Sequence, residues 1–119
     1  MKSQLLKEFI RREVKNVLRE GVADDIFRQL GGNRFVMMTG AKNIAGGRNH
    51  LQFKLPKAKD SINFVKITLN GWDTYDIEFG RTRMIKGEYT YKVVHSVEGI
   101  YNDQLQEIFT RYTGLYTKL

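Results

Sequence analysis

The sequence predicts a single α+β domain, in which an antiparallel sheet of four or five strands carries N-terminal helices and a C-terminal helix on one face. Apolar residues recur at helical spacing near both ends of the chain and alternate with polar residues in between. The alternating segments are joined by short connections, which favours an antiparallel meander over parallel crossover units. Because 119 residues is the size of one domain and no linker divides the chain, residues 1–119 are expected to form one unit.

Two amphipathic helices are expected in the N-terminal part. The first covers residues 4–20, between Ser3 as N-cap and Gly21 as stop, with an apolar stripe of Leu6, Ile10, Val14 and Val17. The second begins at Asp24, ends at Gly31 and turns inward Val22, Ile26, Phe27 and Leu30. Carboxylates in the first turn of that helix are explained by its dipole and need no catalytic role.

From Arg34 onward the period of the pattern changes to two, which predicts strands. A short apolar strand is expected at residues 35–38, and four alternating strands follow near residues 51–55, 65–69, 75–79 and 89–93. Glycine- and proline-containing turn signals separate them at residues 45–47, 56–61, 70–71 and 86–87. The alternation places three tyrosines in the core: Tyr75, Tyr89 and Tyr91.

A last helix is expected from about Asn102 to Tyr112, ended by Gly114. The predicted element order is therefore two helices, five strands and one helix. Helices from both ends of the chain can cover one face of such a sheet while the other face stays partly wet.

Composition excludes several classes of protein. Without cysteine there is no disulfide framework, thiol nucleophile or thiolate metal site, and the chain fits a reducing compartment. No apolar run is long enough for a signal peptide or a membrane span. We therefore expect a cytoplasmic protein with no membrane partner and no cofactor.

The net charge of +7 is concentrated in the first half of the chain. Residues 1–59 contain 13 Lys/Arg and 5 Asp/Glu, whereas residues 60–119 contain 7 and 8. No acidic residue lies between Asp25 and Asp60. Such asymmetry is typical of a surface that meets polyanions, although a solubilising surface of one sign has the same composition.

Three glycine-containing turns in this basic half each carry a nearby cation. They are residues 31–34, 39–43 and 46–49, with Arg34, Lys42 and Arg48. Consecutive backbone N–H groups in such turns can bind an anion, and the cation adds charge. A helix C-cap followed by hairpin turns would use the same glycines, and no nucleotide P-loop pattern is present.

Signals for catalysis are weak. Asp76 and Glu78 share a face of a predicted strand and lie near Asp73, a set that could hold Mg²⁺ in a nuclease. The same alternation is typical of the solvent face of any half-buried strand. His50 and His95, the only histidines, lack metal-ligand spacing.

Four segments resemble short uncharacterised proteins of phages, prophages and mobile elements. They are residues 38–43 (MTGAKN), 73–79 (DTYDIEF), 99–106 (GIYNDQLQ) and 113–117 (TGLYT), and the resemblance spans roughly residues 26–119. It carries no active site and transfers no functional residue. It implies a bacterial or phage cytoplasmic setting, in which small basic proteins commonly act on nucleic acid or on a host protein.

The leading hypothesis is a small non-enzymatic protein that binds the phosphate backbone of nucleic acid through its basic half. A protein-binding accessory factor that uses the wet sheet face is the alternative, and a metal-dependent nuclease comes third. Trp72, in a turn, is the aromatic residue expected to be exposed and able to stack on a base. The expected nucleic-acid-binding residues are Arg11, Arg12, Lys15, Arg19, Arg34, Lys42, Arg48, Lys54, Lys57, Lys59 and Trp72.

Overall fold

Five strands form one antiparallel meander in which each strand pairs with the next along the chain. The computed structural model describes residues 21–117, so the helix expected over residues 4–20, with Arg11, Arg12, Lys15 and Arg19, lies outside the described residues. The strands are β1 (Lys42–Gly46), β2 (His50–Lys54), β3 (Phe64–Leu69), β4 (Tyr75–Ile85) and β5 (Glu88–Ile100).

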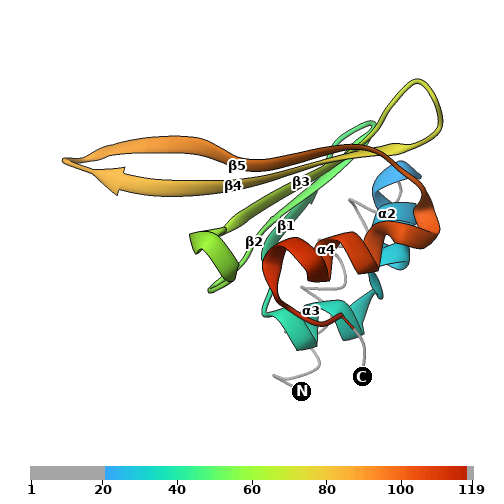
Figure 1. The fold of residues 1–119 in the computed structure, drawn as a ribbon, viewed down its shortest axis with the longest axis horizontal. Coiled ribbons are helices and arrows are strands. Elements are labelled where there is room, and N and C mark those ends of the chain that lie inside the picture. The colour runs from blue at the N-terminus through green and yellow to red at the C-terminus, as the bar shows by residue number, and fades with distance from the viewer. Residues whose placement is uncertain (1–20, 118–119) are drawn as a thin grey trace, which may run out of the picture.

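Three described helices lie on one face of this sheet (Figure 1). They are α2 (Val22–Leu30), α3 (Asn33–Thr39) and α4 (Leu105–Thr113), with short 3₁₀ turns at Lys59–Ser61 and Asn102–Gln104. The predicted α+β class is confirmed, as are the helices on both sides of the strand region in the chain. No helix within residues 21–117 has the length and apolarity to cross a bilayer.

The core lies between the helices and the odd-numbered residues of β2, β3 and β4. Leu51, Phe53, Val65, Ile67, Ile77 and Phe79 are all buried there. The ring of Phe35 packs edge-on against Phe53 and Phe109, with centroids 5.1 and 5.3 Å apart. These three aromatic rings join α3, the sheet and α4 into one cluster, as edge-to-face packing favours.

The prediction of a strand at residues 35–38 is wrong, because these residues belong to α3. The Thr39 hydroxyl donates to the Phe35 carbonyl at 2.7 Å, and Gly40 ends the helix in the left-handed conformation. Phe35 is fully buried whereas Met37, two residues later, is 84% exposed, which a strand buried on one face would not allow. Packing of one large ring decided the conformation of a short apolar run whose period is ambiguous.

The first strand is instead β1, which replaces the predicted turn around Lys42. Asn43 has a φ of 53°, and the register against β2 shifts between Lys42 and Ala45. This irregular edge strand lacks the clean alternation that sequence reasoning depends on, so its residues resembled a loop. The other predicted strands are confirmed, although β4 and β5 extend well beyond their expected ends.

The extra length of β4 and β5 forms a projecting arm. These strands have 11 and 13 residues, whereas β3 has six and pairs with β4 only from Tyr75 to Gly80. Residues 81–93, called the arm below, therefore continue as a two-stranded ribbon beyond the sheet (Figure 1). Tyr75 is buried as predicted, but Tyr89 and Tyr91 are 69% and 46% exposed, so their assignment to the core is wrong.

Phe35→Ala is expected to lower the free energy of unfolding by about 3–5 kcal/mol, the usual cost of removing a buried phenylalanine. The reason is the loss of its contacts with Phe53 and Phe109. Met37→Ala, the matched control in the same helix, should change it by less than about 0.5 kcal/mol. Urea unfolding of both variants measures this, and equal losses would contradict the helical assignment of α3.

Candidate nucleic-acid interface

The arm presents two chemically different faces. Arg81 pairs in register with Lys92 and Arg83 with Thr90, so these cationic side chains share the face on the helix side. Thr82 pairs with Tyr91 and Met84 with Tyr89, which places both tyrosines on the opposite face. The alternation of a two-stranded ribbon thus separates charge from aromatic surface.

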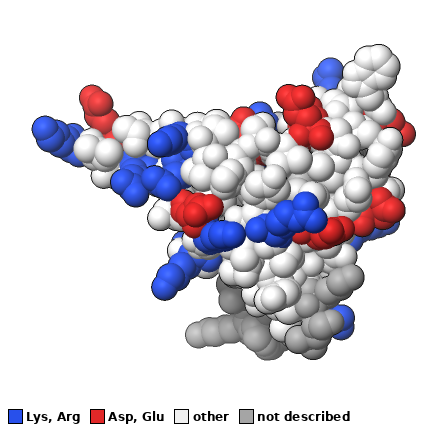
Figure 2. Space-filling view, in the orientation of Figure 1, with Lys and Arg blue, Asp and Glu red and all other residues white. Residues whose placement is uncertain are grey.

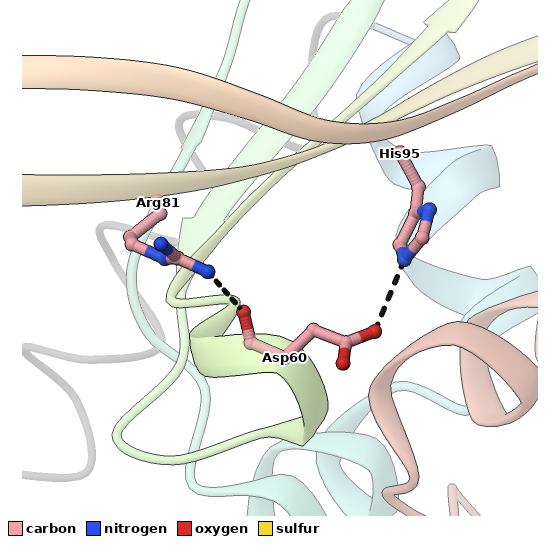
Figure 3. A network of polar contacts seen from close by, with 3 residues as sticks. All are labelled: Asp60, Arg81 and His95. Atoms are coloured by element: carbon pink, nitrogen blue, oxygen red, sulfur yellow. Dashed lines mark hydrogen bonds and ion pairs between the residues drawn. The ribbon is translucent and has the colours of Figure 1, made fainter.

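Asp60 holds the base of the arm from the helix side (Figure 3). The Arg81 guanidinium donates to the Asp60 carbonyl at 2.7 Å, and Nε2 of His95 lies 3.1 Å from the Asp60 carboxylate. Asp60 and Ser61 both have a φ of 59°, a conformation that is uncommon outside glycine. This tight turn brings the β2–β3 connection against both β4 and β5.

Asn63 holds the base of the arm from its edge. Its side-chain oxygen accepts the Thr82 N–H at 2.8 Å, and its Nδ2 donates to the Thr82 carbonyl at 2.9 Å. The backbone N–H of Asn63 also donates to the Gly80 carbonyl at 3.0 Å. The Asn63 side chain therefore forms with Thr82 the pair of hydrogen bonds that the backbone of one further β3 residue would form. It extends the ladder between β3 and β4 to the first residues of the arm.

The sheet has an open face, defined by the even-numbered residues of β2, β3 and β4, which point away from the helices. Lys54, Phe64 and Gly80 form one row across it, and Gln52, Lys66 and Glu78 form the next. Among residues 21–117 no helix lies on this face (Figure 1). The aromatic face of the arm continues the open face toward the tip.

Tyr91 is seated where the arm meets the open face. Its ring occupies the space that a side chain at Gly80 would need, and the Phe64 ring packs edge-on against it at 5.6 Å. The Tyr91 hydroxyl donates to the Glu78 carboxylate. Partial burial and this hydrogen bond raise the pKa of Tyr91 above its ordinary value of 10.0.

Tyr89 lies farther out on the same face and is the more exposed of the two tyrosines. The Lys54 ammonium sits 5.8 Å from the centroid of the Tyr89 ring, within cation–π range. A cation from the sheet and a ring from the arm are therefore neighbours, although 35 residues separate them in the chain.

The expected cationic residues that the structure describes do not all converge. Lys42 and Lys54 are register partners on the open face, while Lys57 and Lys59 lie on the β2–β3 connection at the base of the arm. Arg34 lies on α3, and Arg48 lies in the β1–β2 turn at the other end of the strands.

Trp72 is 88% exposed, as predicted, and Asn70 orders its turn by accepting the Trp72 N–H at 2.8 Å. Its turn joins β3 to β4 at the end of the sheet away from the arm. Burial and, to a lesser degree, the nearby carboxylates of Asp25 and Asp73 raise the pKa of Tyr75 at this end of the sheet. Trp72 is therefore exposed but distant from the cations of the arm.

The glycine turns give their backbone donors to the chain itself. The N–H groups of Gly31 and Gly32 bond to carbonyls of α2, that of Gly40 bonds to Val36, and that of Gly47 bonds to His50. The His50 ring also lies against Gly47, where it would collide with an added Cβ. These glycines act in helix ends and a hairpin turn, the structural alternative to an anion site.

The carboxylates of the nuclease hypothesis have other partners. Asp76 accepts hydrogen bonds from Nδ2 of Asn70 at 2.9 Å and from the Gly99 N–H at 3.2 Å. Glu78 accepts the Tyr91 hydroxyl. Within the part of the chain that the structure describes, no three His, Asp or Glu side chains converge as a metal site.

Sequence reasoning missed the cations and aromatics that the arm contributes. The sequence did contain a signal for the cations, a second window without acidic residues. Between Glu78 and Glu88 there is no Asp or Glu, and the charged residues there are Arg81, Arg83 and Lys86. Figure 2 shows Lys and Arg side chains along the arm and around its base, whereas Asp and Glu are more frequent toward the opposite end of this view. The missed residues are Arg81, Arg83, Lys86, Tyr89, Tyr91 and Lys92 on the arm, together with Phe64 and Lys66 on the open face.

No protein-family model, curated protein or solved structure matches this chain.

Burial and, to a lesser degree, the Lys66 ammonium lower the pKa of His50 from its ordinary value of 6.5. As the pH falls, His50 is therefore protonated in the unfolded chain before it is protonated in the folded chain. The stability that neutral His50 contributes is complete above pH 6.5 and is lost as the pH falls toward the lowered pKa. Lys66→Met should raise the pKa of His50, as followed by NMR titration of its ring protons. Lys86→Met, at the tip of the arm, is the matched control, and an unchanged pKa in Lys66→Met would contradict the assignment.

Proposed function

We propose that the protein is a non-enzymatic nucleic-acid-binding module whose phosphate contacts come from the arm and its base. The observation that carries the proposal is the gathering of nine described cations on the arm, at its base and on the two adjoining rows of the open face, against three carboxylates, Asp60, Glu78 and Glu88. This local balance of +6 compares with +7 for the whole chain. The cations are Lys42, Lys54, Lys57, Lys59, Lys66, Arg81, Arg83, Lys86 and Lys92.

Two further features support this proposal. Two of the three carboxylates are hydrogen-bonded within the chain, Asp60 to His95 and Glu78 to Tyr91, so their side chains are directed at protein groups and do not pair with the cations of the arm. A two-stranded ribbon is also narrow enough to follow a nucleic-acid groove or backbone, as β-ribbon proteins do. Cations on a projecting element reach phosphates without collision between the polymer and the rest of the domain.

A protein partner is the second candidate, and one observation favours it. Met84 and Ile85, near the tip of the arm, are 58% and 49% exposed. Exposed apolar side chains on a projecting hairpin are typical of protein contacts. The cations around them favour nucleic acid as the first candidate.

A cytoplasmic setting in a bacterium or in a phage-infected cell is part of the proposal. The chain contains no cysteine and so needs no disulfide, which fits a reducing compartment. The bacterial or phage part of this proposal rests only on the resemblance of residues 38–43, 73–79, 99–106 and 113–117 to phage and mobile-element proteins.

The double variant Arg83→Ala/Lys92→Ala should weaken binding to both DNA and RNA and reduce the slope of log K against log salt by about 2, one for each lost phosphate contact. Fluorescence anisotropy with labelled oligonucleotides at several salt concentrations measures both quantities.

The matched control is Arg34→Ala/Arg48→Ala, which removes the same charge from α3 and the β1–β2 turn. It should keep the salt slope of the unmodified protein. Equal effects of the two double variants would mean that net charge matters and the arm does not. Absence of binding at low ionic strength would exclude the proposed function.

Catalysis is not part of the proposed function. Plasmid DNA, single-stranded DNA and RNA incubated with the protein and Mg²⁺ or Mn²⁺ should stay intact, because Asp76 and Glu78 are hydrogen-bonded within the sheet. Gel electrophoresis measures this. Cleavage that disappears in Asp76→Ala/Glu78→Ala would contradict the non-enzymatic proposal and restore the nuclease hypothesis.

A further inference from the structure

The aromatic face of the arm is exposed in a way that the fold itself does not require. Tyr89 is 69% exposed. The fold does not need an aromatic ring at this position of a two-stranded ribbon, because a polar side chain would fit there equally well. Tyr91 is 46% exposed although three groups, Gly80, Phe64 and Glu78, hold it in place. A ring that its neighbours hold in place and that is still partly open to solvent is a preformed stacking surface.

The spacing of the two tyrosines selects one form of nucleic acid. Residues i and i+2 on one strand lie roughly 6.6 Å apart. This is about twice the 3.4 Å rise per nucleotide of a B-form strand. Neighbouring bases that rest one on each tyrosine must therefore be unstacked from each other, which a single strand allows and an intact duplex does not.

Charge beside the rings supplies the path for a backbone. The Lys54 ammonium lies 5.8 Å from the Tyr89 ring, and Lys42 is the register partner of Lys54 on β1. Lys66 lies on the same open face, in the row next to Phe64. Aromatic rings interleaved with cations on an exposed sheet are the arrangement by which single-stranded nucleic acid is bound without strong sequence preference.

We infer that the substrate class of this interface is single-stranded nucleic acid, with bases stacked on Tyr89 and Tyr91 and phosphates bound by Lys54, Lys66 and Lys42. The inference rests on the proposed function and deepens it. Tyr89 is the outer platform and Tyr91 the inner one, next to Phe64. The cationic face of the arm, with Arg83 and Lys92, contacts the backbone without reading bases.

The decisive experiment compares three probes of equal length by fluorescence anisotropy: oligo(dT) of about 12 nucleotides, within the site sizes of single-strand-binding folds, an abasic strand, and a duplex. The unmodified protein should bind oligo(dT) most tightly. Tyr89→Leu should weaken oligo(dT) binding by about tenfold, near the low end of what stacking on one aromatic ring contributes. The abasic strand, which offers phosphates but no bases, should bind Tyr89→Leu and the unmodified protein equally.

Tyr116→Leu is the matched control, because Tyr116 is also 69% exposed and lies near the C-terminus, after α4. It should leave the affinities for all three probes unchanged. Tyr89→Phe keeps the ring and should retain the affinity for oligo(dT). Because Tyr89 is largely exposed, these substitutions act on a surface position and leave the core intact.

The outcomes separate this inference from the proposed function. If Arg83→Ala/Lys92→Ala weakens binding of every probe while Tyr89→Leu leaves the ratio of oligo(dT) to abasic affinity unchanged, nucleic-acid binding stands and base stacking is excluded. Tighter binding of the duplex would also overturn the inference. If no probe binds, both proposals fail. A dimer that Tyr89→Leu dissociates, with oligo(dT) binding unchanged, would assign the face to a second copy of the chain.

Discussion

The mismatch in strand length is the constraint on which the rest of the structure depends. The strands β1, β2 and β3 have five or six residues, whereas β4 and β5 have 11 and 13. Toward the arm, the described helices cover the sheet only as far as the row of Phe79 and His95, so the core ends there. Beyond that row, the hairpin has one partner strand and no described helix against it. The arm, its exposed tyrosines and its accessible cations all follow from this difference in length.

A two-stranded ribbon is only marginally stable by itself, and side chains at its base compensate for this. Asn63 continues the hydrogen-bond ladder of β3 by pairing both backbone groups of Thr82. Asp60 contacts Arg81 on β4 and His95 on β5 from the helix side. On the other side, Tyr91 covers Gly80 and bonds to Glu78. The base of the arm is thus held at its edge and on both faces, which gives its side chains fixed positions relative to the sheet.

The cations of the basic half of the chain separate in space. Antiparallel pairing of β1 with β2 places Lys42 beside Lys54 at the end of the sheet from which the arm projects. The β2–β3 connection folds back on β4 and places Lys57 and Lys59 near the base of the arm. Arg48, within the same acid-free window, lies at the far end of the hairpin. The remaining cations at the arm come from the later, nearly neutral half of the chain. Charge along a sequence predicts a polyanion partner, whereas strand pairing decides which charges share a surface.

The sequence by itself determined the α+β class, the helix that follows Gly21, the helix that precedes Gly114, and the strands from His50 onward. The reason is that hydrophobic periodicity is local: each of these segments has one apolar face, and the spacing of its own apolar residues shows that face. Only the tertiary structure decided that residues 35–38 form a helix, since the Phe35 ring must reach Phe53 and Phe109. Tertiary structure also decided that Tyr89 and Tyr91 are exposed. Alternation separates the two faces of a strand, but whether a face is buried depends on how far the covering elements reach, and that is set by parts of the chain distant in sequence.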